Sequence, residues 1–252
     1  MAKPRVGLFV TCLVDFFRPT VGFAALKLLT DAGCEVVVPD TQTCCGQPAF
    51  NSGADDQALV IARNVLHAFV DLDYVVAPSG SCAGMIRCHY PDLFIHPKER
   101  EMARDLAAKT YELVSFLVDV LDYQGEIPDF SARVTYHDSC SGLRELGIKK
   151  QPRKLLERVK GLELCEMKEP ETCCGFGGTF CAKYPKISEH MVGSRTEDIA
   201  ASGAEVLLGG DMGCLLNMAG KASRERRRFV VRHVAEVLAG MTGDEPIGGE
   251  HE

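Results

Sequence analysis

Short apolar runs alternate with longer amphipathic stretches along the first half of the chain. Residues 5–11, 35–38 and 74–77 are apolar runs bounded by polar or turn-forming residues, which is typical of buried strands. Residues 20–32 and 55–70 carry apolar side chains at helical spacing and predict amphipathic helices. Strands that alternate with helices in this way favour a parallel sheet covered by helices.

The second half of the chain shows the same alternation. Its apolar runs predict strands near 133–137, 162–167 and 205–208. Each half ends in an apolar stretch with a helical pattern, at residues 111–121 and 231–238, and we expect a closing helix at both. The fold class indicated is therefore α/β, with parallel sheets and covering helices in both halves.

The cysteine positions indicate that the two halves are copies of one unit. Matched cysteines are offset by 128, 129 and 132 residues, for the pairs Cys12 and Cys140, Cys44 and Cys173, and Cys82 and Cys214. Nearly constant offsets at three sites predict a tandem duplication with two pseudo-symmetric repeats. Turn-forming residues interrupt the pattern near 125–131. We expect a first repeat at 1–127, a second repeat at 128–240 and a disordered tail at 241–252.

Composition and charge narrow the class of protein. The 252 residues are 46% hydrophobic and 25% charged, which is an ordinary balance for a globular chain with a substantial core. A formal net charge of -7 argues against a nucleic-acid-binding protein, which would normally carry a basic face. No apolar run approaches the roughly 18 residues of a membrane span. The first apolar run is followed by Asp15 and Arg18 rather than by a signal-peptide cleavage pattern, so we expect a cytoplasmic protein without membrane insertion.

Eight of the twelve cysteines follow predicted strands in two matched sets. The first set is Cys12, Cys44, Cys45 and Cys82, and the second set is Cys140, Cys173, Cys174 and Cys214. The carboxyl ends of parallel strands meet at one rim of a sheet, where ligands bind. We therefore expect each set to converge on one place. In a reducing compartment such a cluster indicates a metal site or redox centre rather than a disulfide framework.

Four thiols per set match the number that an iron–sulfur cluster requires, either [2Fe–2S] or [4Fe–4S]. The glycine after each vicinal pair, Gly46 or Gly175, permits a positive φ and a close approach of backbone N–H groups to sulfur. Four thiolates also suit structural zinc, but zinc ligands are usually paired two to four residues apart, whereas 31 residues separate Cys12 from Cys44. A strained vicinal disulfide is the third alternative.

These motifs resemble the cysteine-rich CCG domain family, which includes the heterodisulfide reductase B subunit and the iron–sulfur subunit of glycolate oxidase. The resemblance covers both halves, and the run from His137 to Gly147 is similar to the lactate utilization branch of the family. The resemblance implies one or two clusters per chain, of the [4Fe–4S] type, held by the eight cysteines. It also implies a role in oxidising L-lactate to pyruvate, together with a ferredoxin-like iron–sulfur subunit and a third subunit.

One departure from the fullest family motif changes the expected chemistry. That motif supplies a fifth cysteine, but Met85 and Asn217 stand at the corresponding positions of this chain. We therefore favour one-electron transfer over disulfide reduction of the heterodisulfide reductase type. A zinc-stabilised scaffold subunit is the remaining alternative.

The other cysteines and one histidine complete the set of candidates. Cys88 and Cys181 could each be an additional ligand or a buried structural thiol, and we favour the structural role. We interpret Cys34 and Cys165 as core residues. His137 could donate a hydrogen bond to a cluster sulfur, relay a proton or simply be satisfied by the neighbouring loop, and Asp138 could cap the following helix.

Overall fold

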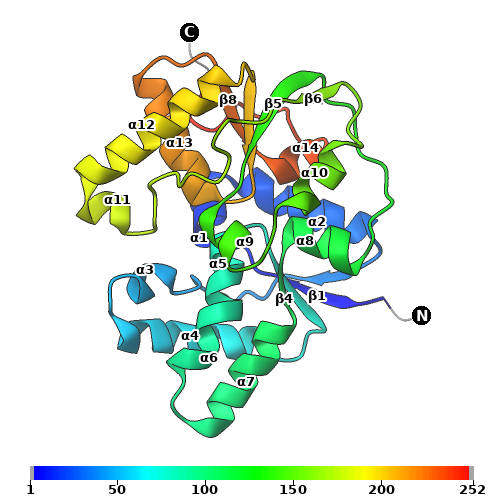
Figure 1. Ribbon diagram of the computed structural model, residues 1–252. Coiled ribbons are helices and arrows are strands. Elements are labelled where there is room, and N and C mark those ends of the chain that lie inside the picture. The colour runs from blue at the N-terminus through cyan, green and yellow to red at the C-terminus, as the bar shows by residue number, and fades with distance from the viewer. Residues whose placement is uncertain (1–2, 250–252) are drawn as a thin grey trace.

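Each half of the chain forms its own four-stranded parallel sheet. The computed structural model describes residues 3–249, and Figure 1 shows the two halves one above the other. The strands of the first half are β1 (Arg5–Leu8), β2 (Glu35–Val37), β3 (Tyr74–Ala77) and β4 (Thr110–Glu112). The strands of the second half are β5 (Ala132–His137), β6 (Leu162–Leu164), β7 (Val206–Gly209) and β8 (Val230–His233). The predicted α/β class with two parallel, helix-covered repeats is confirmed.

Helices connect the strands in the same general order in both halves. In the first half they are α1 (Cys12–Phe17), α2 (Pro19–Asp31), α3 (Gln47–Phe50), α4 (Asp55–Phe69), α5 (Gly80–Gly84), α6 (Tyr90–Leu93), α7 (Pro97–Ala108) and α8 (Leu113–Ser115), with two π-helical segments, η1 (Met85–His89) and η2 (Phe116–Val120). In the second half they are α9 (Cys140–Arg144), α10 (Lys150–Leu156), α11 (Phe180–Lys183), α12 (Pro185–Ala201), α13 (Met212–Arg224) and α14 (Val234–Ala239). Within the described part of the chain, no helix is long and apolar enough to cross a membrane.

Strand order creates a switch point in each sheet. The orders are β2-β1-β3-β4 and β6-β5-β7-β8, so the chain leaves β1 in one direction and returns to its other side as β3. All pairings are parallel, with Val6 next to Tyr74 and Val134 next to Val206. Loops diverge from the carboxyl ends of the two central strands, which is where open parallel sheets bind ligands.

The two halves share one hydrophobic core. Side chains alternate between the faces of a strand, and in β3 Val76 enters the shared core while Val75 faces a smaller cluster whose buried residues all belong to the first half. The shared core also contains Leu28 of α2 and Leu238 of α14, and these two helices pack against each other. The repeats are thus joined by buried apolar surface and not only by the chain between them.

The two predicted closing helices differ from the structure. The stretches 111–121 and 231–238 were each expected to be a single helix, but each contributes to a fourth strand before it becomes helical. Val231 pairs with Leu207, and Tyr111 pairs with Val76. The pleated edge of each sheet accommodates these β-branched and aromatic side chains, so sheet pairing overrides the helical pattern at the start of both stretches.

Part of the segment expected to be a disordered tail contacts the second sheet. Ile247 is buried and forms an antiparallel bridge with Val231 at the edge of the second sheet. Residues 250–252 of the expected tail lie outside the described residues. The predicted boundary at 127/128 falls between η2 and β5.

Candidate metal centres

The four motif sulfurs of the first half lie at the switch point between β1 and β3. Cys12 begins α1 after β1, and Cys82 lies in the first turn of α5 after β3. The vicinal pair Cys44 and Cys45 comes from the loop after β2. The Sγ atoms of Cys12 and Cys44 are 3.8 Å apart, and those of Cys45 and Cys82 are 3.4 Å apart. The fold therefore brings this set together from three separate segments.

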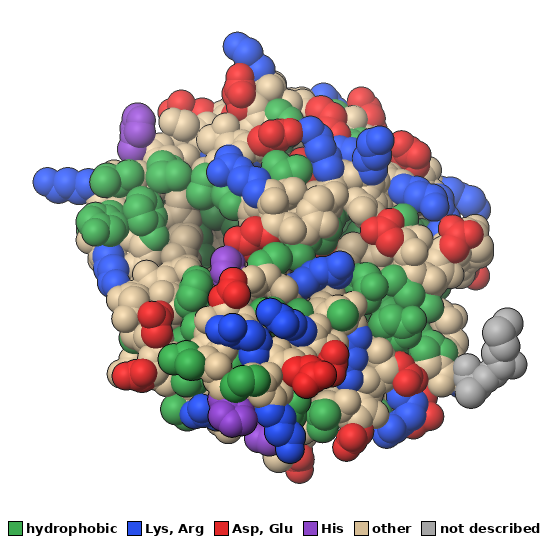
Figure 2. Space-filling model, turned by 60° about the horizontal axis from the view of Figure 1, so that its bottom comes forward, with side chains coloured by type: hydrophobic (Ala, Val, Ile, Leu, Met, Phe, Trp, Pro, Cys, Tyr) green, Lys and Arg blue, Asp and Glu red, His purple; other side chains and the backbone are tan. Residues whose placement is uncertain are grey.

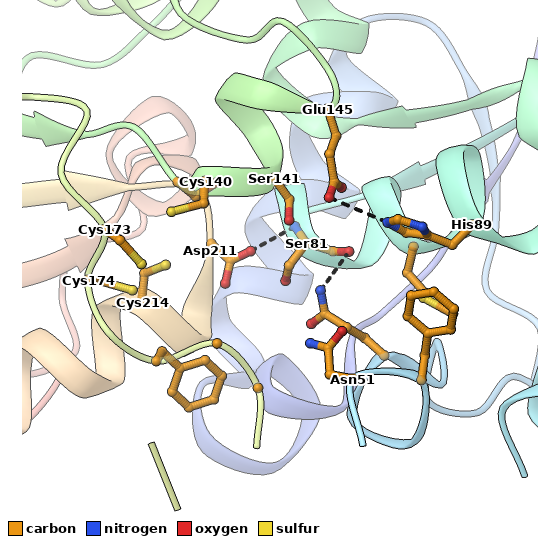
Figure 3. Close-up of a pocket in the computed structure, with 17 residues that line it drawn as sticks. Asn51, Ser81, His89, Cys140, Ser141, Glu145, Cys173, Cys174, Asp211 and Cys214 are labelled. Carbon is orange, nitrogen blue, oxygen red and sulfur yellow. Dashed lines mark hydrogen bonds and ion pairs between the residues drawn. The ribbon is translucent and has the colours of Figure 1, made fainter. Parts of the chain in front are cut away.

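The second half repeats this arrangement. Cys140 begins α9 after β5, Cys214 lies in the first turn of α13 after β7, and Cys173 and Cys174 come from the loop after β6. Figure 3 shows the four side chains pointing toward one another. A ring nitrogen of His137 and the Sγ atoms of Cys174 and Cys214 all lie within 4.8 Å of one another. Each predicted set of cysteines thus converges.

Neighbouring sulfhydryls lower the pKa of one thiol in each set. Sulfhydryl hydrogen bonds from Cys12 and Cys45 lower the pKa of Cys44 to about 3. In the second half, hydrogen bonds from Cys140 and Cys174 lower the pKa of Cys173 to about 2. The donating thiols show the opposite effect, because their hydrogen bonds and burial raise the pKa of Cys12 and Cys140. Each site therefore prefers negative charge at the first cysteine of its vicinal pair.

The glycine after each pair shapes the loop as the sequence indicated. Gly46 has φ = 82° and Gly175 has φ = 77°, both in the left-handed region that favours glycine. Their backbone N–H groups donate to the sulfurs of Cys44 and Cys173, each at 3.4 Å. A Cβ at Gly175 would lie 2.9 Å from the carbonyl oxygen of Ser188 on α12, so a side chain there would force the loop away.

Two neighbouring cavities border the two centres and share part of their lining. About 170 Å³ of space borders the second centre, about 110 Å³ borders the first, and Phe176 and Asp211 line both spaces. The buried carboxylate of Asp211 accepts hydrogen bonds across the halves, from the Ser79 hydroxyl at 3.1 Å and the Ser81 backbone at 2.8 Å. Figure 2 shows a hollowed face of the molecule on which acidic and basic side chains are interspersed.

A family model for the cysteine-rich CCG domain matches residues 6–87 and again 134–219. This chain belongs to the CCG cysteine-rich domain family. It is 49% identical over 235 residues to lactate utilization protein A of Geobacillus kaustophilus and 48% identical to that of Bacillus subtilis. Both alignments cover 93% of this chain and 98% of the relative.

A solved structure shares the fold of this CCG protein. The crystal structure of a hypothetical protein from Helicobacter pylori superposes with a TM-score of 0.69 at 11% sequence identity. The alignment covers 97% of this chain and 50% of the other chain. At this level of identity the match supports the architecture alone.

The donor set of each CCG repeat fits an iron–sulfur cluster. Each site offers four converging sulfurs, one of them already favoured as thiolate, and a backbone N–H directed at that sulfur. The two motif cysteines outside the vicinal pair stand in the first turns of the helices that follow the two central strands. Thiolate ligands with N–H donors around them suit an anionic cluster.

The two positions that lack a fifth cysteine have structural surroundings of their own. Asn217 on α13 donates from Nδ2 to the carbonyl oxygen of Cys174 at 2.9 Å and so fixes the cysteine loop. Met85 is buried at the start of η1 and lines the cavity beside the second centre.

The remaining cysteines make local contacts. The Cys88 sulfhydryl faces the carbonyl oxygen of Glu145 at 4.0 Å, and that of Cys181 faces the carbonyl oxygen of Gly178 at 3.6 Å. Cys34 is buried in the shared core as expected. The prediction that Cys165 is a core residue is wrong, because it is half-exposed beyond the end of the short strand β6.

The structure assigns Asp138 a role other than the predicted cap. Ser139 caps α9 by accepting from the backbone of Gly142 at 3.3 Å. Asp138 is buried and receives both terminal nitrogens of Arg153 at 2.9 Å, which is a bidentate ion pair.

Sequence reasoning missed Arg195 and Asp211, two buried charged residues near the centres. Arg195 contacts the Nδ1 atom of His137 from 58 positions away, and its place on α12 gave no signal of burial. Asp211 occupies the position of Ser79 in the first repeat. This difference between the aligned repeats was a signal that could have singled out Asp211.

Proposed function

We propose that this chain is an iron–sulfur electron-transfer subunit of a system that oxidises L-lactate to pyruvate. The observation that carries the proposal is the convergence of four sulfurs at the switch point of each sheet. In the first half, these four sulfurs form two contacts, of 3.8 and 3.4 Å. The names of the relatives, which refer to lactate utilization, support the substrate class.

The eight motif cysteines would serve as the ligands of one or two [4Fe–4S] clusters. A bound cluster would supply one-electron oxidation and reduction, and the chain would set its charge environment. Gly46 and Gly175 would each donate a backbone hydrogen bond to a ligand sulfur, and the apolar packing around Cys45 and Cys174 would exclude water from the inner edge of each site.

Electron transfer requires partners, and we propose a ferredoxin-like iron–sulfur subunit and a third subunit in the cytoplasm. Disulfide reduction of the heterodisulfide reductase type receives less support, because Met85 and Asn217 offer no additional thiolate. The hydrogen bond from Asn217 to the Cys174 carbonyl gives that position a different purpose.

Anaerobic purification followed by metal and sulfide analysis tests the proposal. We expect a brown protein with iron and acid-labile sulfide in equal amounts, and an EPR signal after reduction. Zinc without sulfide would contradict the proposal and favour the scaffold alternative, because zinc is bound by thiolates without sulfide and is colourless. The isolated subunit should not reduce an acceptor with lactate, and turnover without partners would contradict the electron-transfer assignment.

A further inference from the structure

His137 is the one buried histidine whose free nitrogen faces no acceptor in the described chain. Its side chain is at the carboxyl end of β5, with 1% of the residue exposed. Within residues 3–249, its Nε2 atom is buried and lacks a hydrogen-bond partner. A buried N–H group without a partner is energetically costly, so such a group indicates a ligand that belongs at the site.

Arg195 determines which nitrogen of His137 carries the proton. The Nε atom of Arg195 donates to Nδ1 of His137 at 3.2 Å, and its Nη2 atom lies 3.1 Å from the same nitrogen. An arginine side chain has donors only, so Nδ1 must be the acceptor and the proton of the neutral ring must be on Nε2.

The arginine is itself held in place on the other side. It is fully buried on α12, and its terminal nitrogens donate to the backbone carbonyls of Glu169 and Pro170, in the segment that leads to Cys173. Asp198 lies 3.5 Å away as its ion-pair partner. This network ties the orientation of the His137 ring to the cysteine loop.

The polarity of this contact argues against His137 as a metal ligand. A histidine that binds a metal usually donates its other N–H to a carboxylate or carbonyl, which leaves a lone pair for the metal. Here the second partner is a donor, so Nε2 holds a proton and has no lone pair to offer. The ring nevertheless lies in the compact group with the sulfurs of Cys174 and Cys214.

We infer that His137 donates a hydrogen bond from Nε2 to a sulfur of the second centre and thereby raises the reduction potential of that centre above the potential of the first. The inference rests on the proposed function, since it requires a cluster at the second set of cysteines. A donor to sulfur stabilises the additional negative charge of the reduced cluster. The first repeat has Phe9 at the equivalent position, in an apolar cluster with Cys45, Cys82 and Phe69, and Phe9 has no donor to offer.

Redox titration of the His137→Phe variant, followed by EPR, tests this inference. Phenylalanine reproduces the residue of the first repeat. We expect the variant to keep its iron and sulfide while one cluster becomes about tenfold harder to reduce at a fixed poise, a fall of about 59 mV for one electron. The other cluster should be unchanged. In His137→Gln an amide oxygen can accept from Arg195 and an amide N–H can donate, so its potential should lie nearer the wild type.

Pulsed EPR of the reduced wild-type protein, with ¹⁵N-labelled histidine, gives a second measurement that needs no stable variant. A weak nitrogen coupling that disappears in His137→Gln or His137→Phe is expected of a hydrogen-bonded ring. The large coupling of a directly bonded nitrogen, or no coupling at all, would overturn the inference. An unshifted potential in a fully loaded His137→Phe protein would do the same. A wild-type chain that takes up no iron and sulfide would instead overturn the proposed function itself.

Discussion

Phe9 and His137 occupy equivalent positions in the two repeats, yet they place different chemistry beside the two sets of cysteines. Phe9 packs against Phe69 with ring centroids 5.6 Å apart, in a cluster that is apolar. His137 instead contacts the buried guanidinium of Arg195. The four sulfurs are arranged alike in both halves because the two repeats share the same strand order and place their cysteines at the same strand ends. The neighbouring side chains are free to differ between the repeats, so the two sets of cysteines can have different electrostatic environments.

The fourth strands end in a similar contrast. Glu112 at the end of β4 caps α8, and its carboxylate accepts from the backbone of Ser115 at 2.9 Å. His233 at the end of β8 caps α14, and its Nδ1 atom accepts from the backbone of Ala235 at 3.1 Å. Both caps are buried, so an acid in one half and a base in the other perform the same structural task.

Removal of one vicinal pair at a time is the strongest test of whether both repeats bind a cluster. We expect Cys44→Ser with Cys45→Ser, and separately Cys173→Ser with Cys174→Ser, each to lose about half of the bound iron, because each cluster needs its own thiolates. Iron, sulfide and the EPR spectrum provide the measurement. Cys165→Ser, outside both sets, is the control and should retain all of its iron. A double variant with full iron would show that its half holds no cluster.

Substitution of Arg195 tests how much the buried contacts beside the second centre contribute to the stability of the fold. Arg195→Met removes the ion-pair partner of Asp198 and the donor to two backbone carbonyls and to Nδ1 of His137. We expect the free energy of unfolding of the metal-free protein to fall by about 3–5 kcal/mol. Urea denaturation measures this change.

The matched control for Arg195 lies on α4, the corresponding helix of the first half. Arg63 forms a surface ion pair with Glu99 at 2.7 Å, so Arg63→Met should change stability little. Equal losses in the two variants would contradict the view that the arginine on α12 stabilises the fold through burial while the one on α4 does not.

The two caps should give the halves opposite pH dependences. Burial, together with nearby Asp211 and Asp119, raises the pKa of Glu112 from 4.5 to about 7. Between these values the unfolded chain has released the proton and the folded chain has kept it, so stability falls as pH rises, by up to about 3 kcal/mol. Burial lowers the pKa of His233 from 6.5 to about 4. Between these values the unfolded chain has taken up a proton and the folded chain has not, so stability rises with pH by a similar amount.

Single substitutions of the caps separate the two contributions, which oppose each other in the wild type. Glu112→Gln should expose the rise in stability between pH 4 and 6.5, and His233→Asn should expose the fall between pH 4.5 and 7. Urea denaturation of the metal-free protein across this range is the measurement. Parallel stability curves for the two variants would show that the caps do not titrate as their burial requires.

The sequence predicted the convergence of the cysteines because parallel topology determines where strand ends meet. Cys12 and Cys82 needed only the knowledge that each follows a strand. The sequence pattern did not predict β4 or β8, because these short edge strands run directly into apolar helices without a turn residue. Arg195 could not be found from sequence, since an arginine on an amphipathic helix normally faces solvent and only the fold brings it to His137.

Cys88 and Cys181 give the smallest expected effects and the sharpest test of whether both centres use four sulfurs. Each sulfhydryl faces a backbone carbonyl, at 4.0 Å for Cys88 and 3.6 Å for Cys181, and a serine hydroxyl can make the same kind of contact. Cys88→Ser and Cys181→Ser should therefore keep the iron content and EPR spectrum of the wild type. If Cys181→Ser alone lost iron or altered one signal, the second centre would use an additional thiolate. The two halves would then differ in their ligands as well as in the side chains beside them.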